Sequence, residues 1–184
     1  MGKQFDLIII GAGPGGYVAA KKAAKLGMSV VIIDKGDVGG TCINRGCIPT
    51  KALVHAAMLY REMTECEKFG LSAEKVGFDL QKIYEYKDLS AARMREELEK
   101  EFKELGVVSV RGTATIQSDK KVRVVTPNKE EEYYYGKHIL IATGARARTI
   151  DIPGLDLPGV MTSEELLTSN ESQYRRLLIL GGGV

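Results

Sequence analysis

The sequence lacks any apolar run that approaches the roughly 20 residues of a membrane-spanning helix. It lacks a basic and apolar leader, because a strand-like run begins by Phe5. It also lacks a strong charge imbalance, with 26 basic against 24 acidic side chains, and so gives no sign of the basic stripe typical of nucleic-acid binding. We therefore expect a cytoplasmic protein with neither a membrane nor a nucleic-acid partner.

Cysteine is scarce as well, since three in 184 residues are too few for a disulfide scaffold. An odd count fits a reducing compartment, where a cysteine pair is more often catalytic or metal-binding. The remaining composition, 44% hydrophobic and 27% charged, is that of a globular protein and excludes disorder and collagen-like repeats. The length fits one domain, or one domain and a fragment of a second.

What the sequence does contain begins with a strand, a glycine turn, a helix and a second strand. Residues 5–10 and 29–34 are continuous apolar runs short enough for strands buried on both faces. Between them, residues 17–28 are rich in alanine and favour a helix whose small face packs closely on a sheet. This βαβ order predicts an α/β, Rossmann-like fold with a central parallel sheet, in which residues 5–10 form the central strand.

Two amphipathic helices and several short strands follow. A helix that ends at about residue 68 repeats apolar residues at helical spacing, and its predicted buried face is Ala52, Ala56, Leu59, Met63 and Cys66. A second helix over 80–105 is predicted to turn inward Met94, Leu98, Phe102 and Leu105. Strands are predicted over 107–111, 121–126, 131–135 and 138–142, as a small antiparallel β-meander that returns to the sheet.

Changes in composition predict three segments. Residues 1–150 form the first domain, and residues 151–175, with two X-Pro steps and two glycines in or beside 152–158, form a linker. Residues 176–184 predict the first strand and glycine loop of a second domain that is cut short. We expect the chain to be the front part of a longer protein.

The glycine turn after the first strand has the spacing G-x-G-x-x-G. Its glycines are Gly11, Gly13 and Gly16, with Pro14 and Gly15 between them. The first glycine permits a tight turn, the second lets a pyrophosphate approach the backbone, and the third lets helix and strand pack closely. The N–H groups at the helix start then face the phosphate charge.

An acidic residue completes this pattern. Asp34 lies 18 residues beyond Gly16, at the end of the second strand, where it can accept hydrogen bonds from ribose hydroxyls. Strand, loop, helix, strand and acid in this order predict a dinucleotide site. An unphosphorylated ribose favours FAD or NAD over NADP.

Two cysteines, Cys42 and Cys47, follow Asp34 closely and are expected near the same ligand. A disulfide needs Cα atoms within about 7 Å, whereas five residues of regular helix rise roughly 7.5 Å. The pair can close only if the chain turns back between them, for which Gly46 supplies the freedom, and Pro49 suits the first turn of the next helix. We expect Cys42 on the irregular segment and Cys47 at the helix start.

The two sulfurs are expected to differ. At the start of the helix, the dipole stabilises the Cys47 thiolate, and Lys51 follows one turn later on the same face. Cys42 is the sulfur better placed to reach an incoming disulfide.

A zinc site built from Cys42, Cys47, His55 and Cys66 is the alternative interpretation of the cysteines. The helical spacing opposes it, because Cys66 lies on the apolar face while His55 lies to one side. We predict no metal, a buried Cys66, and structural or surface roles for His55 and His138.

The motif G-G-T-C-I-N-R-G-C-I-P-T-K, with G-A-G-P-G-G before it and I-L-I-A-T-G-A and I-P-G after it, resembles the class of flavin-dependent pyridine nucleotide disulfide oxidoreductases. Within the class, C-I-P-T-K-A-L-V-H-A-A is most similar to the dihydrolipoamide dehydrogenases. Glutathione and mercuric reductases are similar but less close.

This resemblance implies a set of residues around FAD. They are Gly11, Gly13, Pro14, Gly15 and Gly16 at the pyrophosphate, Asp34 with its neighbour Lys35 at the adenosine ribose, Gly40, Thr41 and Cys42 beside the flavin, Lys51 near its ring, Gly112 and Ala114 facing the adenine, and Thr143, Gly144 and Ala145 in a second FAD-contacting turn. Asp34 stands where the family usually has glutamate.

The resemblance also implies roles and partners. Cys42 corresponds to the interchange thiol and Cys47 to the charge-transfer thiol, with Lys51 as the third catalytic residue. Electrons pass between a dithiol or lipoyl-domain substrate, the cysteine pair, FAD and NAD. The whole parent is expected to be a homodimer that associates with a 2-oxoacid dehydrogenase or glycine cleavage complex, and this part alone is not expected to complete turnover. A glutathione- or mercuric-type reductase and a non-enzymatic thiol redox sensor remain open.

Overall fold

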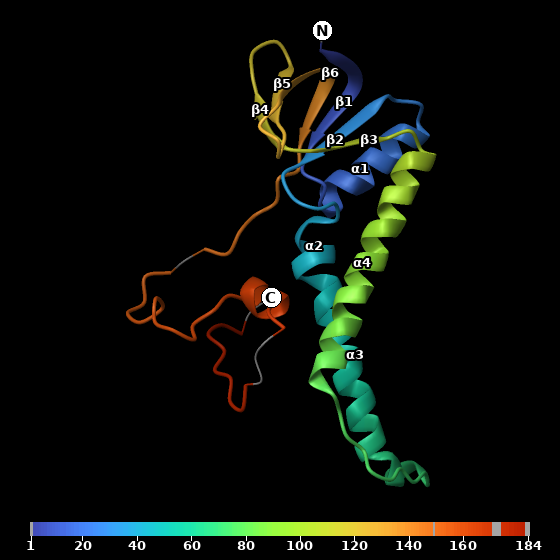
Figure 1. Ribbon diagram of the computed structural model, residues 1–184, viewed down its shortest axis with the longest axis vertical. Coiled ribbons are helices and arrows are strands. Elements are labelled where there is room, and N and C mark those ends of the chain that lie inside the picture. The colour runs from blue at the N-terminus through green and yellow to red at the C-terminus, as the bar shows by residue number, and fades with distance from the viewer. Residues whose placement is uncertain (1, 149, 171–173, 183–184) are drawn as a thin grey trace.

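The computed structural model describes residues 2–148, 150–170 and 174–182, and places an α/β unit at one end of a long pair of helices (Figure 1). Its elements in chain order are β1 (Lys3–Ile10), α1 (Pro14–Lys25), β2 (Val30–Asp34), α2 (Gly40–Arg45), α3 (Cys47–Thr64), the 3-10 helix η1 (Cys66–Phe69), α4 (Leu80–Glu104), β3 (Val108–Arg111), β4 (Thr113–Ile116), β5 (Lys121–Val125), β6 (Glu131–Ile141) and α5 (Ser163–Thr168).

The six strands form one sheet in the order β3-β2-β1-β6-β5-β4. β1 pairs in parallel with β2 on one side and β6 on the other, which confirms residues 5–10 as the central strand. β3 also pairs in parallel with β2, while β5 and β4 add antiparallel pairs beyond β6. The α/β fold with a central parallel sheet and a small antiparallel meander is therefore confirmed.

The sheet is buried on both faces, as its unbroken apolar strands predict. Ile9 of β1 packs with the helices on one face, in a cluster that includes Phe102 of α4. Its neighbour Ile8 points to the other face, where the meander curls over the sheet and contributes Val122 and Tyr134. β6 can make this curl because it carries Gly136, where a Cβ would lie 2.8 Å from Cγ1 of Ile8.

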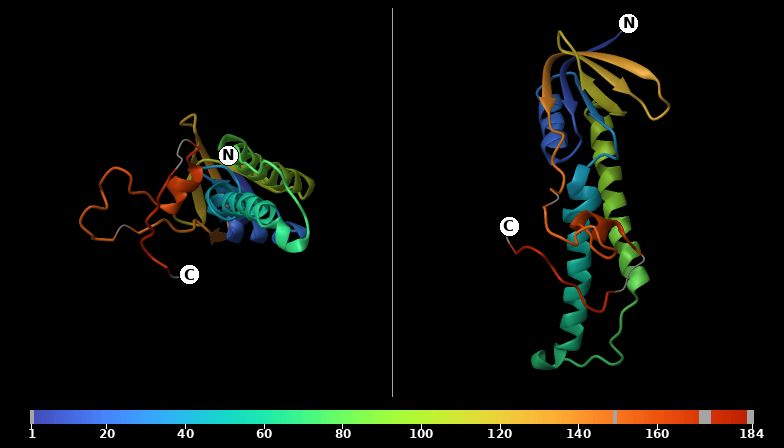
Figure 2. Two further views of the ribbon diagram at one scale, coloured as in Figure 1. Left: turned by 90° about the horizontal axis from the view of Figure 1, so that it is seen from below. Right: turned by 90° about the vertical axis from the view of Figure 1, so that its left-hand side faces the viewer.

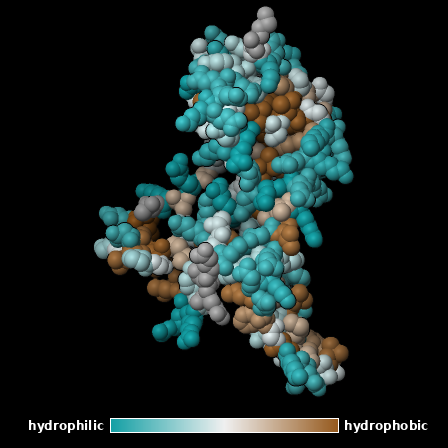
Figure 3. Space-filling model, viewed as in Figure 1, coloured by the Kyte–Doolittle hydropathy of each residue, from teal (hydrophilic) through white to brown (hydrophobic). Residues whose placement is uncertain are grey.

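The long helices are only partly buried. Leu98 and Phe102 of α4 are in the core, and Ala52 of α3 is buried, as predicted. The predicted inward positions of Met94, Leu59 and Met63 are wrong, because these side chains are 39%, 46% and 44% exposed. α3 and α4 extend past the sheet, so their distal turns pack mainly against each other (Figure 2). Apolar side chains gather on the free end of this helix pair (Figure 3).

Cys66 is another correction, because the predicted helix ends early. α3 stops at Thr64, and Cys66 begins η1 near the tip of the helix pair, where it is half-buried. Its Sγ lies 3.6 Å from the carbonyl oxygen of Leu71. His55 and His138 are exposed, in agreement with the prediction.

The C-terminal half of the sheet differs in detail from the prediction. Thr113–Ile116 forms a strand that the sequence did not indicate, and Glu131–Ile141 is one strand rather than two. Residues 152–158 have no helix or strand, as expected of a linker. Residues 176–180 are not a strand here, because none of the described strands lies beside them to share backbone hydrogen bonds. No helix within the described ranges is both long and apolar enough to cross a membrane.

Candidate functional site

The glycine turn lies where β1 ends and α1 begins. Gly11 has a φ of +107°, and a Cβ there would lie 2.2 Å from the carbonyl oxygen of Ala142. A Cβ on Gly16 would lie 1.8 Å from the carbonyl oxygen of Gly11. These two positions therefore require glycine so that turn, helix and β6 can pack together.

Gly13 and Gly15 differ from those two glycines because they border open space. The nearest atom to a Cβ on Gly13 is 3.8 Å away, and for Gly15 the distance is 3.9 Å. Gly13 also caps α1 without a side chain, so the first N–H groups of the helix face outward. The turn thus offers bare backbone N–H groups and room beside them, which fits a pyrophosphate group.

Asp34 fastens this turn to the end of β2. Its Oδ2 accepts from the N–H of Ala12 at 2.7 Å, and its Oδ1 accepts from the N–H of Gly36 at 2.8 Å. Each carboxylate oxygen has a second lone pair, so both remain able to accept from ribose hydroxyls. The sequence indicated a ligand role for Asp34 but not this structural one.

A cavity of about 380 Å³ opens beside Asp34, between β3 and the C-terminal part of α4. Its lining includes Phe102, Lys103, Val107 and Arg111. Gly112 lies at the same edge, where its N–H donates to the Asp34 carbonyl oxygen at 2.8 Å. The apolar wall and the basic side chains suit the adenosine end of a dinucleotide.

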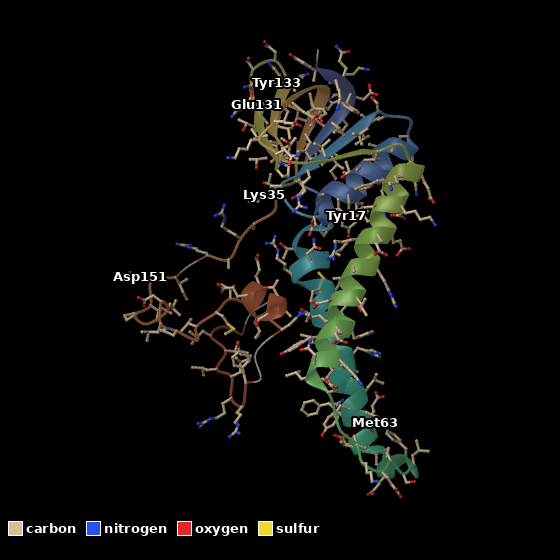
Figure 4. The ribbon with its side chains drawn as sticks, viewed as in Figure 1. Tyr17, Lys35, Met63, Glu131, Tyr133 and Asp151 are labelled. Atoms are coloured by element: carbon tan, nitrogen blue, oxygen red, sulfur yellow. The ribbon has the colours of Figure 1, made fainter. Side chains whose placement is uncertain are left out.

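Several of the other residues predicted to surround the cofactor lie near the glycine turn. Ala114 is half-buried against the second core cluster, and Lys35 is exposed at the edge of the sheet where β2 ends (Figure 4). Thr143, Gly144 and Ala145 follow β6 directly, and the Cα of Thr143 would lie 3.0 Å from a Cβ on Gly11. The ends of β1, β2 and β6 therefore bring these segments to one edge of the sheet.

The segment that carries the cysteines presses against the glycine turn. Gly39 has a φ of +100° and donates its N–H to the carbonyl oxygen of Ala12 at 2.8 Å. A Cβ on Gly40 would lie 2.6 Å from the Cα of Gly13. This contact places Thr41 and Cys42 directly beside the candidate phosphate site.

The two cysteines lie on consecutive helices that meet at Gly46. Cys42 is within α2, which corrects its predicted place on an irregular segment, while Cys47 is the first residue of α3, as predicted. A Cβ on Gly46 would lie 3.0 Å from the carbonyl oxygen of Thr41, so the chain bends tightly here. Both thiols are free; Cys42 is half-buried and Cys47 is exposed.

The electrostatic surroundings of the pair are uneven. The pKa of the Cys42 thiol is raised, first by burial and then by its hydrogen bond and charge interaction with Cys47. The positive charge of Lys51 acts in the opposite direction on that pKa. Cys47 stands at the positive end of an 18-residue helix. Burial and the neighbouring thiol thus make Cys42 hold its proton more strongly than an ordinary cysteine does.

The zinc interpretation finds no geometric support. Cys66 lies on η1, beyond the far end of α3 from Cys47. Within the described part of the chain, no group of three or more histidine, cysteine or acidic side chains is arranged to hold a metal ion.

α5 also reaches this site, a contact that the sequence did not predict. Arg45, between the two cysteines, pairs through Nη1 with Oε1 of Glu164 at 2.5 Å. Lys87 of α4 donates from Nζ to the Leu167 carbonyl oxygen at 2.8 Å and to Oδ1 of Asn170 at 2.7 Å. α5, which lies within the predicted linker, is thereby held against α2 and α4 (Figure 1).

Known proteins share this arrangement. A model of the pyridine nucleotide-disulphide oxidoreductase family matches residues 5–184. The chain is 37% identical to dihydrolipoyl dehydrogenase of Zymomonas mobilis, over 100% of this chain and 39% of that protein. It is also 37% identical to the mitochondrial dihydrolipoyl dehydrogenase of Dictyostelium discoideum, over 99% of this chain and 38% of that protein.

A solved structure is similar as well, the Cu(II) complex of the HOCl-induced flavoprotein disulfide reductase RclA from Escherichia coli. The TM-score is 0.75 at 30% identity, over 93% of this chain and 35% of that one. The chain therefore spans somewhat more than a third of the length of these relatives. With the glycine turn, the cysteine pair and the sheet all in agreement, the chain belongs to the pyridine nucleotide-disulphide oxidoreductase family.

Proposed function

We propose that this chain is the FAD-binding, dithiol-bearing part of a dihydrolipoamide dehydrogenase-like flavoenzyme. One observation supports this most directly: the segment that leads into Cys42 packs on the glycine turn, with the N–H of Gly39 2.8 Å from the carbonyl oxygen of Ala12. A nucleotide on the turn and a thiol on α2 are then neighbours.

The residues that would hold FAD follow from the site. Gly13, Pro14 and Gly15 would face the pyrophosphate, while Asp34 and the cavity beside it would take the adenosine. Gly40, Thr41 and Lys51, together with the turn at 143–145, would hold the other end of the cofactor. When bound, the flavin supplies the two-electron transfer between the dithiol and NAD.

The cysteine pair supplies the thiol chemistry. With a disulfide substrate, the Cys42 thiolate attacks one sulfur, forms a mixed disulfide and releases the other sulfur as a thiolate. The Cys47 thiolate then attacks Cys42, forms the intramolecular disulfide and releases the second substrate thiolate. The substrate gains two electrons and the cysteine pair loses two; a dithiol substrate reverses each step.

The substrate and partners are assigned from the relatives named dihydrolipoyl dehydrogenase. We infer a lipoyl-type dithiol as the substrate, a homodimeric parent in the cytoplasm, and association with a 2-oxoacid dehydrogenase or glycine cleavage complex. The similarity to a flavoprotein disulfide reductase favours a second candidate, in which the same site reduces a disulfide.

The proposal is tested by titrating the purified chain with FAD, because the structure offers a variant that should fold but not bind. A Cβ on Gly13 would meet only the Cα of Gly40, at an ordinary contact distance of 3.8 Å, so Gly13→Val should leave the unfolding midpoint within a few degrees of the wild type. The valine side chain would fill the place of the pyrophosphate, and we expect the FAD dissociation constant to rise at least about 100-fold, the effect of losing about 2.7 kcal/mol.

Gly77→Val is the matched control, since Gly77 lies in the loop before α4 with no atom within 4 Å of an added Cβ. It should bind FAD as the wild type does. A folded wild-type chain that binds no FAD, or a Gly13→Val chain that binds it equally well, would contradict the proposal. A colourless chain whose disulfide alters a partner's affinity would instead favour the thiol sensor.

A further inference from the structure

Asn44 lies on α2 between the two cysteines, and its side chain braces the turn in front of that helix. Its Nδ2 donates to the carbonyl oxygen of Val38 at 3.1 Å and to that of Gly40 at 3.0 Å. These two carbonyl groups flank Gly39, which has a left-handed conformation and caps α2 without a side chain. The amide therefore bridges the turn that presses on the phosphate loop.

The other end of the amide is held by α4. Oδ1 of Asn44 accepts from Nη1 of Arg95 at 2.9 Å. A guanidinium group only donates, and a carbonyl oxygen only accepts. The full set of hydrogen bonds therefore forms in one orientation of the amide alone, and Arg95 fixes that orientation.

α2 depends on tertiary contacts to stay in place, among them its buried Ile43 and the hydrogen bonds of Asn44. It has six residues, an uncapped glycine at its start and Gly46 at its end. A helix this short is not stable by itself, so tertiary contacts must hold it. Cys42 lies two residues before Asn44 on this helix, and its distance to Cys47 depends on where α2 sits.

We propose that Asn44 and Arg95 are positioning residues for the dithiol. Together they hold α2 so that Cys42 stays beside both Cys47 and the glycine turn. The use of the dithiol rests on the proposed function, but the positioning belongs to the chain without any cofactor.

The test measures how well the two thiols are held together in the flavin-free chain, in a Cys66→Ser background. The chain is equilibrated in glutathione buffers, where closing the Cys42–Cys47 bond passes two electrons to glutathione disulfide and yields two glutathione thiols. The equilibrium constant, in molar units, is the effective concentration of the two thiols. Arg95→Met should lower it about tenfold, the factor expected for one charge-assisted hydrogen bond.

Three variants show whether the effect is specific. Arg93→Met removes an exposed arginine from the same helix and should leave the equilibrium constant within twofold of the parent. Arg95→Lys keeps a donor for Oδ1 and should recover most of the loss. Asn44→Asp keeps the acceptor for Arg95 but cannot donate to the two carbonyl groups, so it should lower the constant as Arg95→Met does.

Far-UV circular dichroism confirms that each variant is folded. If Arg95→Met does not fold, the comparison of Asn44→Asp with Arg93→Met decides. The proposal is overturned if Arg95→Met, or in its absence Asn44→Asp, matches Arg93→Met. FAD plays no part in this measurement. If the proposed function is wrong, the chain should fail to bind flavin while the effective concentrations keep their expected values.

Discussion

At Cys42, burial and a neighbouring thiol act on the pKa in the same direction. Both disfavour the charged form, and Lys51 opposes them less strongly. A pKa above the ordinary value means that less Cys42 thiolate is present near neutral pH. Near neutral pH Cys42 is therefore held mainly as the thiol, while Cys47 lies exposed at the N-terminus of α3.

The pH dependence of alkylation tests this assignment. In a Cys66→Ser background, the rate at which iodoacetamide modifies Cys42 should rise at a higher pH than for an unperturbed cysteine. Cys47→Ala removes the second and third causes of the shift, so the midpoint should move to lower pH. Lys51→Met removes an opposing charge and should move it to higher pH. Peptide mass spectrometry identifies the modified sulfur, and shifts in the reverse directions would contradict the assignment.

At the residue scale, the sequence predicted which residues form the candidate site, but not the hydrogen bonds that hold those residues in place. The spacing of Gly11, Gly13 and Gly16 follows from local turn geometry, so the pattern was enough to place them. The two hydrogen bonds of Asp34 to the loop and the Arg95 contact to Asn44 join segments distant in sequence, for which no local spacing exists.

At the scale of elements, the strands at the centre of the sheet could be predicted from the sequence, whereas β4 and the buried face of α3 could not. Residues 7–10 of β1 and 30–33 of β2 are continuously apolar because both faces of the sheet are covered there, and this is visible in the sequence. β4 is short and mostly exposed, so it carries little apolar signal. Leu59 and Met63 repeat at helical spacing, yet on the extended part of α3 their side chains stay 46% and 44% exposed.

α5 shows how a short element can depend on tertiary contacts. It begins with a capping box between Thr162 and Glu165, which satisfies its first N–H groups. Lys87, the one buried charged side chain among the described residues, then binds its C-terminal end. A buried charge is costly unless it is paired, so its persistence here argues for a role in holding α5.

Lys87→Met should release α5 while sparing the rest of the fold. A methionine fits an apolar site without the cost of a buried charge, so the unfolding midpoint should change little. The loss of two hydrogen bonds, about 1 kcal/mol each, should speed proteolytic cleavage within 150–170 about tenfold or more. Lys100→Met, on an exposed turn of α4, is the control. Equal cleavage rates in the two variants would show that Lys87 does not hold α5.

At the scale of the whole molecule, one edge of the sheet gathers the candidate site. The carboxyl ends of β1, β2 and β6 meet there, and the cysteine helices begin there before they project away from the sheet (Figure 2). The domain division at residues 150 and 175 stays a prediction, although α5 is docked on α2 rather than hanging free.

The central claim is that the glycine turn brings the flavin alongside Cys47. A crystal structure of the chain with FAD tests it most directly. We expect the pyrophosphate against Gly13 and Gly15, and the ring in van der Waals contact with Sγ of Cys47, at about 4 Å. A nucleotide bound away from the turn, or a ring out of contact with Sγ of Cys47, would contradict the account.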